Sequence, residues 1–263
     1  MNPRNPEDIR KTALILDERF PDSETLGPTP APSRANSKAL EEPAPPAGKK
    51  IVVNGPLDFE LKHIDLKHPY LLNRGFKPEI IEHFGLGFCS KGLMKNRIVI
   101  PLRDHGGILI GYAGRVVDDA LITDENPRYR FPSGREKDGV YYSFEKSRFL
   151  YNGCQFNSDE PDTEELIVCE SFTAVWHLMG LGIRGVVSVM GSSCSEEQGA
   201  LIAKIVVPQG RVIILTDGDD AGVKCAFSIF TEVGARRVVK WAKLPLGKQP
   251  TDCGKEELTA LLG

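Results

Sequence analysis

From about residue 161 onward the chain alternates short apolar runs with segments of helical pattern, and this alternation restricts the possible folds more than any other feature. A continuously apolar run of about four to eight residues is typical of a strand buried on both faces. Strands that alternate with helices form a parallel sheet with helices on both sides. The runs are 166–170, 185–190, 211–216 and 237–241, and the helical segments are 172–181, 195–207 and 221–233. We therefore predict that residues 161–263 form an α/β domain.

Residues 51–160 carry a mixed pattern that predicts a smaller α+β subdomain. Residues 70–75 end a helical turn at a glycine, and the proline at 78 begins the next helix, so a helical pair is expected. The apolar runs 97–102 and 108–115 flank a cluster of turn residues and predict a hairpin.

The first fifty residues are expected to contribute little to the folded core. A capping Asn5, Pro6 and two following acids predict a short helix in residues 1–20. Seven prolines stand among the thirty residues 21–50, and this stretch has too few apolar side chains to bury a core. Residues 21–50 are therefore predicted to be a disordered linker.

The composition excludes several classes of protein. Lysine and arginine number 33 and aspartate and glutamate 36, so the net charge of −3 does not indicate a nucleic-acid partner, and any basic surface must be local. No apolar run approaches the roughly 20 residues of a membrane span, and the N-terminus lacks the pattern of an export signal. We therefore expect a cytoplasmic protein with no membrane partner. The six cysteines include no Cys-x-x-Cys pair, so we interpret them as structural thiols, with Cys169 buried in a strand.

Acidic residues follow two of the predicted strands at their carboxyl ends. Glu170 ends the first strand, and Asp217 and Asp219 follow the third. Ligands of open parallel sheets bind at this edge, and a hard divalent cation that holds phosphate would relieve the repulsion among gathered carboxylates. The alternative is that Ser171 and Asp220 cap helices and the other acids form a solvated rim. We favour the metal site because a cap needs one acceptor rather than three acids.

Other motifs fit this part of the chain less well. As an EF-hand loop, the sequence from Asp217 has Ala221 at the fifth position and Ser228 at the twelfth, where a bidentate Glu is required. A phosphatase nucleophile at Asp217 would be expected earlier in its sheet. The segment Gly191-Ser192-Ser193 follows the second strand, where it either binds phosphate or caps the next helix.

The acids at the strand ends belong to a pattern found in a known family. Glu170 at the end of one apolar strand, with Asp217-Gly-Asp219-x-Ala-Gly222 two strands later, resembles the Toprim domain of bacterial primases, type IA and II topoisomerases and certain nucleases. Upstream segments resemble the polymerase core of bacterial DNA primase, so that the similarity covers about residues 65–252. These segments are 70–76, 80–88, 97–104, 111–115 and 128–132.

The resemblance implies roles for particular side chains. It implies that Glu170, Asp217 and Asp219 bind the catalytic metal, Mg²⁺ or Mn²⁺, and that basic residues of the preceding subdomain contact a single-stranded template and the incoming nucleotide. Arginines bind phosphates bidentately, and Tyr129 and Phe131 are suited to stack on bases. The alternative is that Arg97 and Arg103 are ordinary charges at strand ends, and that Tyr129 and Phe131 simply pack. The matching basic residues are Arg97, Arg103, Arg115, Arg128 and Lys137.

The chain also departs from the family pattern. Ala174 stands where the family usually has an aspartate, and only Asp252 remains of an acidic pair after the last strand. The number of metal ions is therefore left open, with Asp220 and Asp252 as candidates to replace the missing acids. No zinc-ribbon sequence precedes the core, and the chain ends before the helical and helicase-binding regions of a full primase, so we expect a reduced core.

These features predict a primase-like nucleotidyltransferase, a DNA-directed RNA polymerase that makes short RNA primers on single-stranded DNA. Ribonucleoside triphosphates and the DNA template are the expected ligands, and a replicative helicase or a separate zinc-module protein is a candidate partner. Positioning and electrostatics supply most of such catalysis, so no side-chain nucleophile is required. Two alternatives are a Toprim nuclease that activates water with the same acids, and a non-catalytic module that binds single-stranded DNA.

Overall fold

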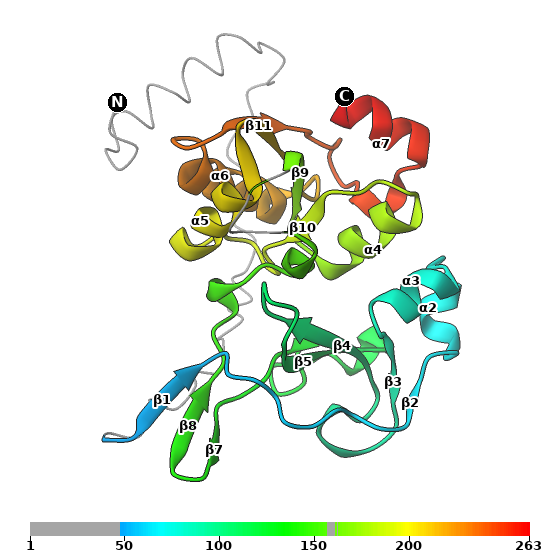
Figure 1. Cartoon of the computed structure of the whole chain (residues 1–263). Coiled ribbons are helices and arrows are strands. Elements are labelled where there is room, and N and C mark those ends of the chain that lie inside the picture. Colours follow the sequence, from blue (N-terminus) through cyan, green and yellow to red (C-terminus); the bar gives the residue numbers. More distant parts are fainter. Residues whose placement is uncertain (1–47, 157–160, 162) are drawn as a thin grey trace, which may run out of the picture. The chain divides into compact units, whose positions relative to one another are not determined.

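A four-stranded parallel sheet organises the C-terminal part of the protein (Figure 1). The structure, a computed structural model, describes residues 48–156, 161 and 163–263, so the predicted N-terminal helix and nearly all of the predicted linker lie outside the described residues. The spatial order of the sheet is β10-β9-β11-β12, and every neighbouring pair is parallel, as predicted. The strands are β9 (Thr163–Cys169), β10 (Val186–Ser188), β11 (Val206–Leu215) and β12 (Val238–Trp241).

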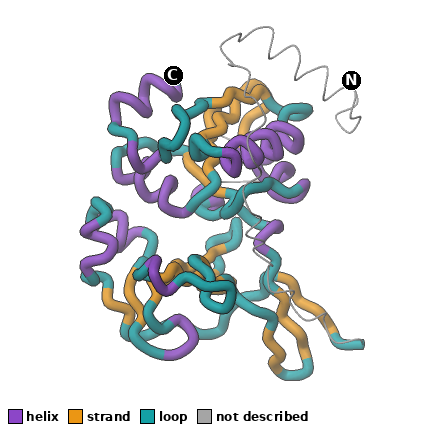
Figure 2. Tube along the Cα trace, turned by 180° about the vertical axis from the view of Figure 1, so that it is seen from behind, coloured by secondary structure: helices purple, strands orange, loops and turns teal. Residues whose placement is uncertain are grey.

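Helices cover both faces of this sheet, and Figure 2 shows its strands between them. Val168 of β9 and Ile214 of β11 pack in one core cluster with residues of α5 and α6. Ile167 and Ile213 point to the opposite face and pack in a second cluster with residues of α4 and α7. Alternation of side chains along each strand therefore supplies two cores. The helices are α4 (Phe172–Gly180), α5 (Glu196–Ile205), α6 (Asp220–Val233) and α7 (Lys255–Leu262).

Polar side chains fix where three of these helices begin. Ser171 caps α4 and Ser195 caps α5, each through a side-chain oxygen that accepts a hydrogen bond from a backbone N–H group. At α6, Asp219 Oδ1 accepts a hydrogen bond of 2.7 Å from the Gly222 N–H group. The cap of α6 is thus Asp219 and not Asp220, which is already the first residue of the helix.

The segment before the parallel sheet contains a five-stranded antiparallel sheet and two short helices. The predicted hairpin is formed by β4 and β5, and the predicted helical pair by α2 and α3. Gly75, just after α2, has φ +81°, the left-handed conformation expected of a glycine that ends a helix. In spatial order the strands are β2 (Ile64–Asp65), β3 (Gly87–Cys89), β4 (Arg97–Arg103), β5 (Leu109–Val116) and β6 (Tyr129–Arg130), and the helices are α2 (Pro69–Asn73) and α3 (Pro78–His83).

A three-stranded sheet in the same region has no counterpart among the predicted elements. It consists of β1 (Lys50–Val53), β7 (Arg135–Lys137) and β8 (Val140–Ser143) in the order β1-β8-β7. Asp138 and Gly139 join β7 to β8 with positive φ angles, the conformation of a two-residue hairpin turn. Short 3₁₀ turns complete the described elements: η1 (Gly92–Met94), η2 (Asp119–Leu121), η3 (Lys146–Arg148), η4 (Gly153–Gln155) and η5 (Pro250–Asp252).

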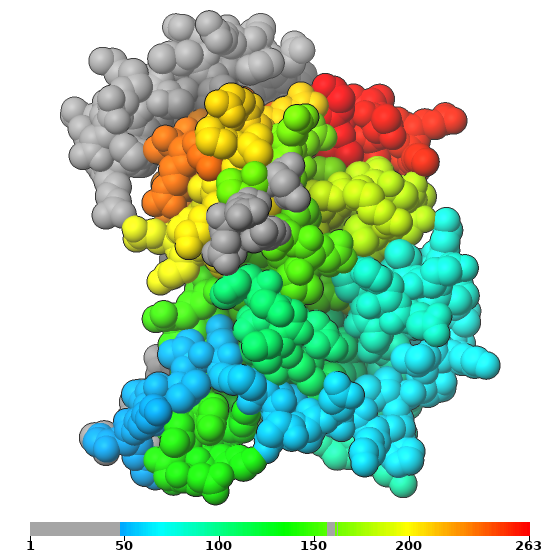
Figure 3. Space-filling model, in the orientation of Figure 1, coloured from blue at the N-terminus to red at the C-terminus, as the bar shows by residue number. Residues whose placement is uncertain are grey.

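The parallel sheet and the preceding region share a core cluster. The Trp176 indole N–H group of α4 donates a hydrogen bond of 2.9 Å to Tyr151 Oη, and its ring packs edge-on against Phe76 with 5.4 Å between centroids. Lys77 Nζ, next to α3, donates to the Gly180 carbonyl at the end of α4 at 2.8 Å. In the space-filling view the segment of α7 lies at the surface beside that of α4 (Figure 3).

The cysteines occupy structural positions. All six thiols are free; five are buried and Cys154 is half-buried. Cys169 is fully buried in β9, as its apolar neighbours predict. Across the described residues, no helix is both long and apolar enough to cross a membrane.

Candidate metal centre

Neighbouring strands of the parallel sheet end level with one another. Leu215 of β11 and Ser188 of β10 both lie opposite Cys169 of β9. Adjacent strands are about 4.8 Å apart and run in the same direction, so the residues that follow them emerge at a common edge. The structure therefore places Glu170 and Asp217 at the same edge of the sheet.

Glu170 lies in an environment that disfavours its negative charge. Its Oε2 atom is buried and has no hydrogen-bond partner. Burial raises the pKa of Glu170 to about 7, and the charges of Asp217 and Asp219 contribute to the increase. A buried carboxylate oxygen without a donor is costly, so a positive charge at this point would be stabilising.

Asp217 is affected in the same way. Burial raises its pKa to about 6, and the charges of Asp219 and Asp252 add to the increase. Asp252 approaches from η5, where its Oδ2 atom accepts a hydrogen bond of 2.8 Å from the Gln249 N–H group. Asp220 and Asp252 were the two candidates to replace the missing acids. Of these, Asp252 is the one whose charge raises the pKa of Asp217.

Two glycines in residues 217–222 allow the backbone of this loop to make close contacts. A Cβ atom at Gly222 would overlap the carbonyl group of Asp217, and one at Gly218 would overlap the carbonyl group of Pro245. The Gly218 N–H group donates to the Lys248 carbonyl at 2.8 Å, and the Gly218 carbonyl accepts from the Gly247 N–H group at 2.7 Å. The loop that carries Asp217 is therefore held against the turn that precedes η5.

The donor set suits a hard divalent cation. The acidic side chains of Glu170, Asp217 and Asp219 offer carboxylate oxygens, which Mg²⁺ and Mn²⁺ prefer. In the described part of the chain, no three His, Cys, Asp or Glu side chains stand close enough to hold an ion together, and Asp219 uses Oδ1 as a helix cap. The unpartnered oxygen of Glu170 and the raised pKa values of Glu170 and Asp217 fit a cation that would supply the missing positive charge.

Two other positions flank this edge. Ala174, where the family usually has an aspartate, is buried in α4. Ser192 and Ser193 are exposed after β10, and because Ser195 caps α5, they take no part in capping it. Phosphate binding by these serines stays a prediction.

Arg97 is almost fully buried within the protein. Its side chain is only 2% exposed, and its guanidinium donates to the Gly114 carbonyl at 2.9 Å, the Pro127 carbonyl at 3.0 Å and Asn126 Oδ1. These bonds tie the β4–β5 hairpin to the loop before β6. The expected template contact is therefore not assigned to Arg97, because its donors are already used inside the protein.

Arg115 is also enclosed. Its guanidinium lies over the rings of Tyr70 and Tyr129 and donates to their hydroxyl oxygens at 2.5 and 3.3 Å. Asp119 approaches it at 3.7 Å. With only 4% of its surface exposed, Arg115 holds α2 against β5 and β6, and we do not assign it a template contact either.

The other three predicted basic residues are exposed. Arg103 ends β4 and donates to the Gly107 carbonyl at 3.0 Å. Arg128 pairs with Asp119 at 3.6 Å, and Lys137 pairs with Asp58 near the β7–β8 turn. Exposed ion pairs are weak, so these contacts hold Arg128 and Lys137 only loosely.

The aromatic residues Tyr129 and Phe131 are half-buried and pack against a core cluster. Both rings contact Phe172 at the start of α4, with centroids 5.5 and 6.1 Å away. Phe131 also stacks on Phe144 at 6.1 Å. Of the two alternatives for this pair, packing is the one that the structure shows.

Lys146 is a basic residue at this edge that was not among the predicted candidates. Its Nζ atom donates to the Met190 carbonyl at 2.9 Å, lies over the Phe131 ring and would be overlapped by a Cβ atom at Gly191. Burial lowers its pKa. Nothing in the local sequence distinguishes it from a surface lysine, because its position depends on how residues 144–149 pack against the parallel sheet.

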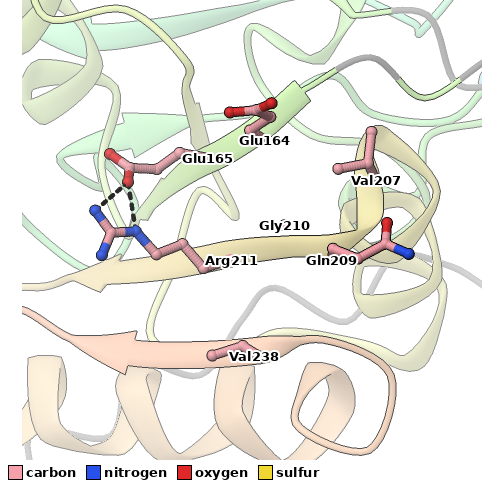
Figure 4. A pocket seen from close by; sticks show the side chains of 7 residues that line it. All are labelled: Glu164, Glu165, Val207, Gln209, Gly210, Arg211 and Val238. Atoms are coloured by element: carbon pink, nitrogen blue, oxygen red, sulfur yellow. Dashed lines mark hydrogen bonds and ion pairs between the residues drawn. The ribbon is translucent and has the colours of Figure 1, made fainter.

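A pocket of about 640 Å³ lies at the other end of the sheet, where β9, β11 and β12 begin (Figure 4). Arg211 points toward Glu165 there, and the two side chains form an ion pair of 2.5 Å. The remaining lining residues are Glu164, Val207, Gln209, Gly210 and Val238. This pocket is at the amino ends of the strands and is separate from the acidic edge.

Comparisons with known proteins agree with this architecture. Residues 164–240 match the model of the Toprim domain. The chain is 28% identical over 233 residues to the DNA primase of Aquifex aeolicus, which covers 73% of this chain and 44% of the relative. It is 30% identical over 166 residues to the DNA primase of Geobacillus stearothermophilus, covering 61% of this chain and 25% of that relative. The chain thus spans less than half of the length of these relatives.

Solved structures give the same result. The zinc-binding and RNA polymerase domains of the Aquifex aeolicus primase align with a TM-score of 0.60 and 26% identity, covering 73% of this chain and 54% of that one. The DnaG primase catalytic domain bound to single-stranded DNA aligns with a TM-score of 0.60 and 25% identity, covering 74% and 70%. The protein contains a Toprim domain and is similar to the catalytic core of bacterial DNA primases over about three quarters of its length.

Proposed function

We propose that this chain is a metal-dependent nucleotidyltransferase of the primase type, which makes short RNA primers on single-stranded DNA. The observation that carries the proposal is the set of mutually repelling acids, one with an unpartnered buried oxygen, at the edge of a Toprim sheet. On this proposal the protein works in the cytoplasm, where its template and ribonucleoside triphosphates are found. The helicase and the zinc-module protein remain predicted partners.

Glu170, Asp217 and Asp219 would hold Mg²⁺ or Mn²⁺. When bound, the cation neutralises the triphosphate and favours the ionised form of the attacking 3′ hydroxyl. Glu170 and Asp217 are suited to this role because burial and mutual repulsion leave their charges poorly stabilised by the protein alone. Asp219 would use the oxygen that does not cap α6.

Basic side chains would orient the nucleic acid and the nucleotide around this centre. Lys146 is half-buried beside Gly191, where its ammonium group is suited to pair with a triphosphate. Arg103, Arg128 and Lys137 are exposed on the preceding region and would bind template phosphates without reading sequence.

The test is primer synthesis from the four ribonucleoside triphosphates on a single-stranded template with Mg²⁺ or Mn²⁺. We expect Asp217→Asn and Asp219→Asn to lower the rate at least about 100-fold, because each removes a carboxylate that would hold the cation, and the cation would stabilise the negative charge of the transition state. Asparagine caps helices as well as aspartate does, so Asp219→Asn leaves the start of α6 intact. Asp124→Asn, which removes an exposed acid, is the matched control and should retain full activity.

Full activity in both site variants would refute the assignment of these acids. The same incubation separates the two alternatives from the proposal. Cleaved DNA in the absence of ribonucleotides would identify a nuclease, and salt-sensitive binding of single-stranded DNA without turnover would identify a binding module.

A further inference from the structure

Two unpartnered buried polar atoms belong to residues at matching positions on neighbouring strands of the parallel sheet. Glu170 Oε2 and Thr216 Oγ1 are both inaccessible to water, and neither makes a hydrogen bond. Cys169 of β9 lies opposite Leu215 of β11. Glu170 directly follows Cys169, and Thr216 directly follows Leu215. Thr216 and Glu170 are therefore level with each other on neighbouring strands.

The alternation of side chains puts both residues on the same face of the sheet. Val168 and Ile214, two positions earlier, both belong to the core cluster on the side of α5 and α6. The period of two along a strand returns Glu170 and Thr216 to that side. Cys225 of α6 belongs to the same cluster, and the Glu170 charge contributes to raising the pKa of its thiol, which agrees with this placement.

The chemistry of the two groups is complementary. A threonine hydroxyl can donate one hydrogen bond, and a carboxylate oxygen can only accept. Thr216 is 1% exposed, so water cannot satisfy its hydroxyl. A buried hydroxyl and a buried carboxylate oxygen that both lack partners destabilise the protein, and a hydrogen bond between them would remove this cost.

We propose that Thr216 is a positioning residue for the metal centre. Its hydroxyl donates to one lone pair of Glu170 Oε2, and the second lone pair and the other carboxylate oxygen remain free to hold a cation. The bond fixes the orientation of the carboxylate and satisfies both buried atoms. This role rests on the proposed function, because it requires a cation at Glu170.

The experiment is a titration of the full chain with Mn²⁺, in which electron paramagnetic resonance measures the concentration of unbound Mn²⁺. Thr216→Val keeps the shape of the side chain and removes the donor, and Thr216→Ser keeps the donor. We expect about tenfold weaker Mn²⁺ binding in Thr216→Val, the usual effect of losing a group that orients a metal ligand. Thr216→Ser should bind within about twofold of the unmodified chain.

Thermal unfolding without metal provides the second measurement. Thr216→Val should unfold at the same temperature as the unmodified chain or higher, since it removes a buried hydroxyl with no partner. Weaker Mn²⁺ binding together with undiminished stability is the combination that a merely structural threonine would not produce.

Two results would overturn the role of Thr216. If Thr216→Val binds Mn²⁺ as well as the unmodified chain does, the threonine does not orient Glu170, while primer synthesis by the unmodified chain would leave the proposed function intact. If the unmodified chain binds no Mn²⁺ and makes no primer, the proposed function fails and the role of Thr216 fails with it.

Discussion

Replacing Glu170 by glutamine is expected to stabilise the metal-free protein at alkaline pH. The pKa of Glu170 is raised from 4.5 to about 7 in the folded state, chiefly by burial. Between these pH values the folded chain binds more protons than the unfolded chain, so stability falls as the pH rises from 4.5 to 7 and stays low above 7. Glutamine carries no charge, so Glu170→Gln does not lose stability in this way as the pH rises.

The size of the effect follows from the change in pKa. At about 1.4 kcal/mol for each tenfold change in proton affinity, the shift corresponds to about 3 kcal/mol. Glu170 is half-buried, so solvent screening reduces the expected gain to about 1–2 kcal/mol. The gain should be present at pH 8.5 and nearly absent at pH 4.5, where the folded protein already holds the proton.

Urea unfolding in the presence of a chelator measures this difference. Glu164→Gln, at an exposed residue of β9, the strand that Glu170 follows, is the control and should change stability by less than about 0.5 kcal/mol. Addition of Mn²⁺ at alkaline pH should stabilise the unmodified chain more than Glu170→Gln, because binding to the folded state adds to its stability. An equal effect of Glu170→Gln at both pH values, or a loss of stability at pH 8.5, would show that Glu170 has a stabilising partner and that the reasoning is wrong.

Three further substitutions test other features. Gly222→Ala should destabilise the protein by about 2 kcal/mol or more in urea unfolding and impair primer synthesis, because its Cβ atom would overlap the Asp217 carbonyl group. Arg97→Lys should cost about 2 kcal/mol or more, since one ammonium group cannot replace a buried guanidinium with several acceptors, and the affinity of the folded variant for single-stranded DNA should be unchanged. Lys146→Met should raise the KM for ribonucleoside triphosphates about tenfold in the primer assay, and an unchanged KM would exclude a contact with the triphosphate.

The sequence predicted the parallel sheet correctly because β9, β10 and β11 each contain a run of residues buried on both faces, and such a run is continuously apolar. Helix α7 was missed, although Glu256 and Glu257 in its first turn and the buried Leu258 and Leu262 carry the usual helical signals. The pairing of β1 with β8 was missed for a different reason. It joins segments far apart in the chain, and no local pattern encodes such a partner.

The acidic residues and the basic residues differ in how far sequence could place them. The position of Glu170 and Asp217 follows from strand order alone, since parallel neighbours end at one edge. The surroundings of Arg97 and Arg115 depend on loops and rings brought together by tertiary packing, and these turn both side chains inward. The same dependence on packing brings Lys146 to the acidic edge.

The pair of backbone hydrogen bonds between Gly218 and the turn at 245–248 links two stretches that the chain places far apart. A change in the length of that turn would disrupt these two hydrogen bonds. Asp217 and Asp219, which flank Gly218, would then change their orientation. A graft of the Asp217–Gly222 loop into a foreign scaffold would therefore need the later turn as well, since backbone atoms, and not side chains, transmit the alignment.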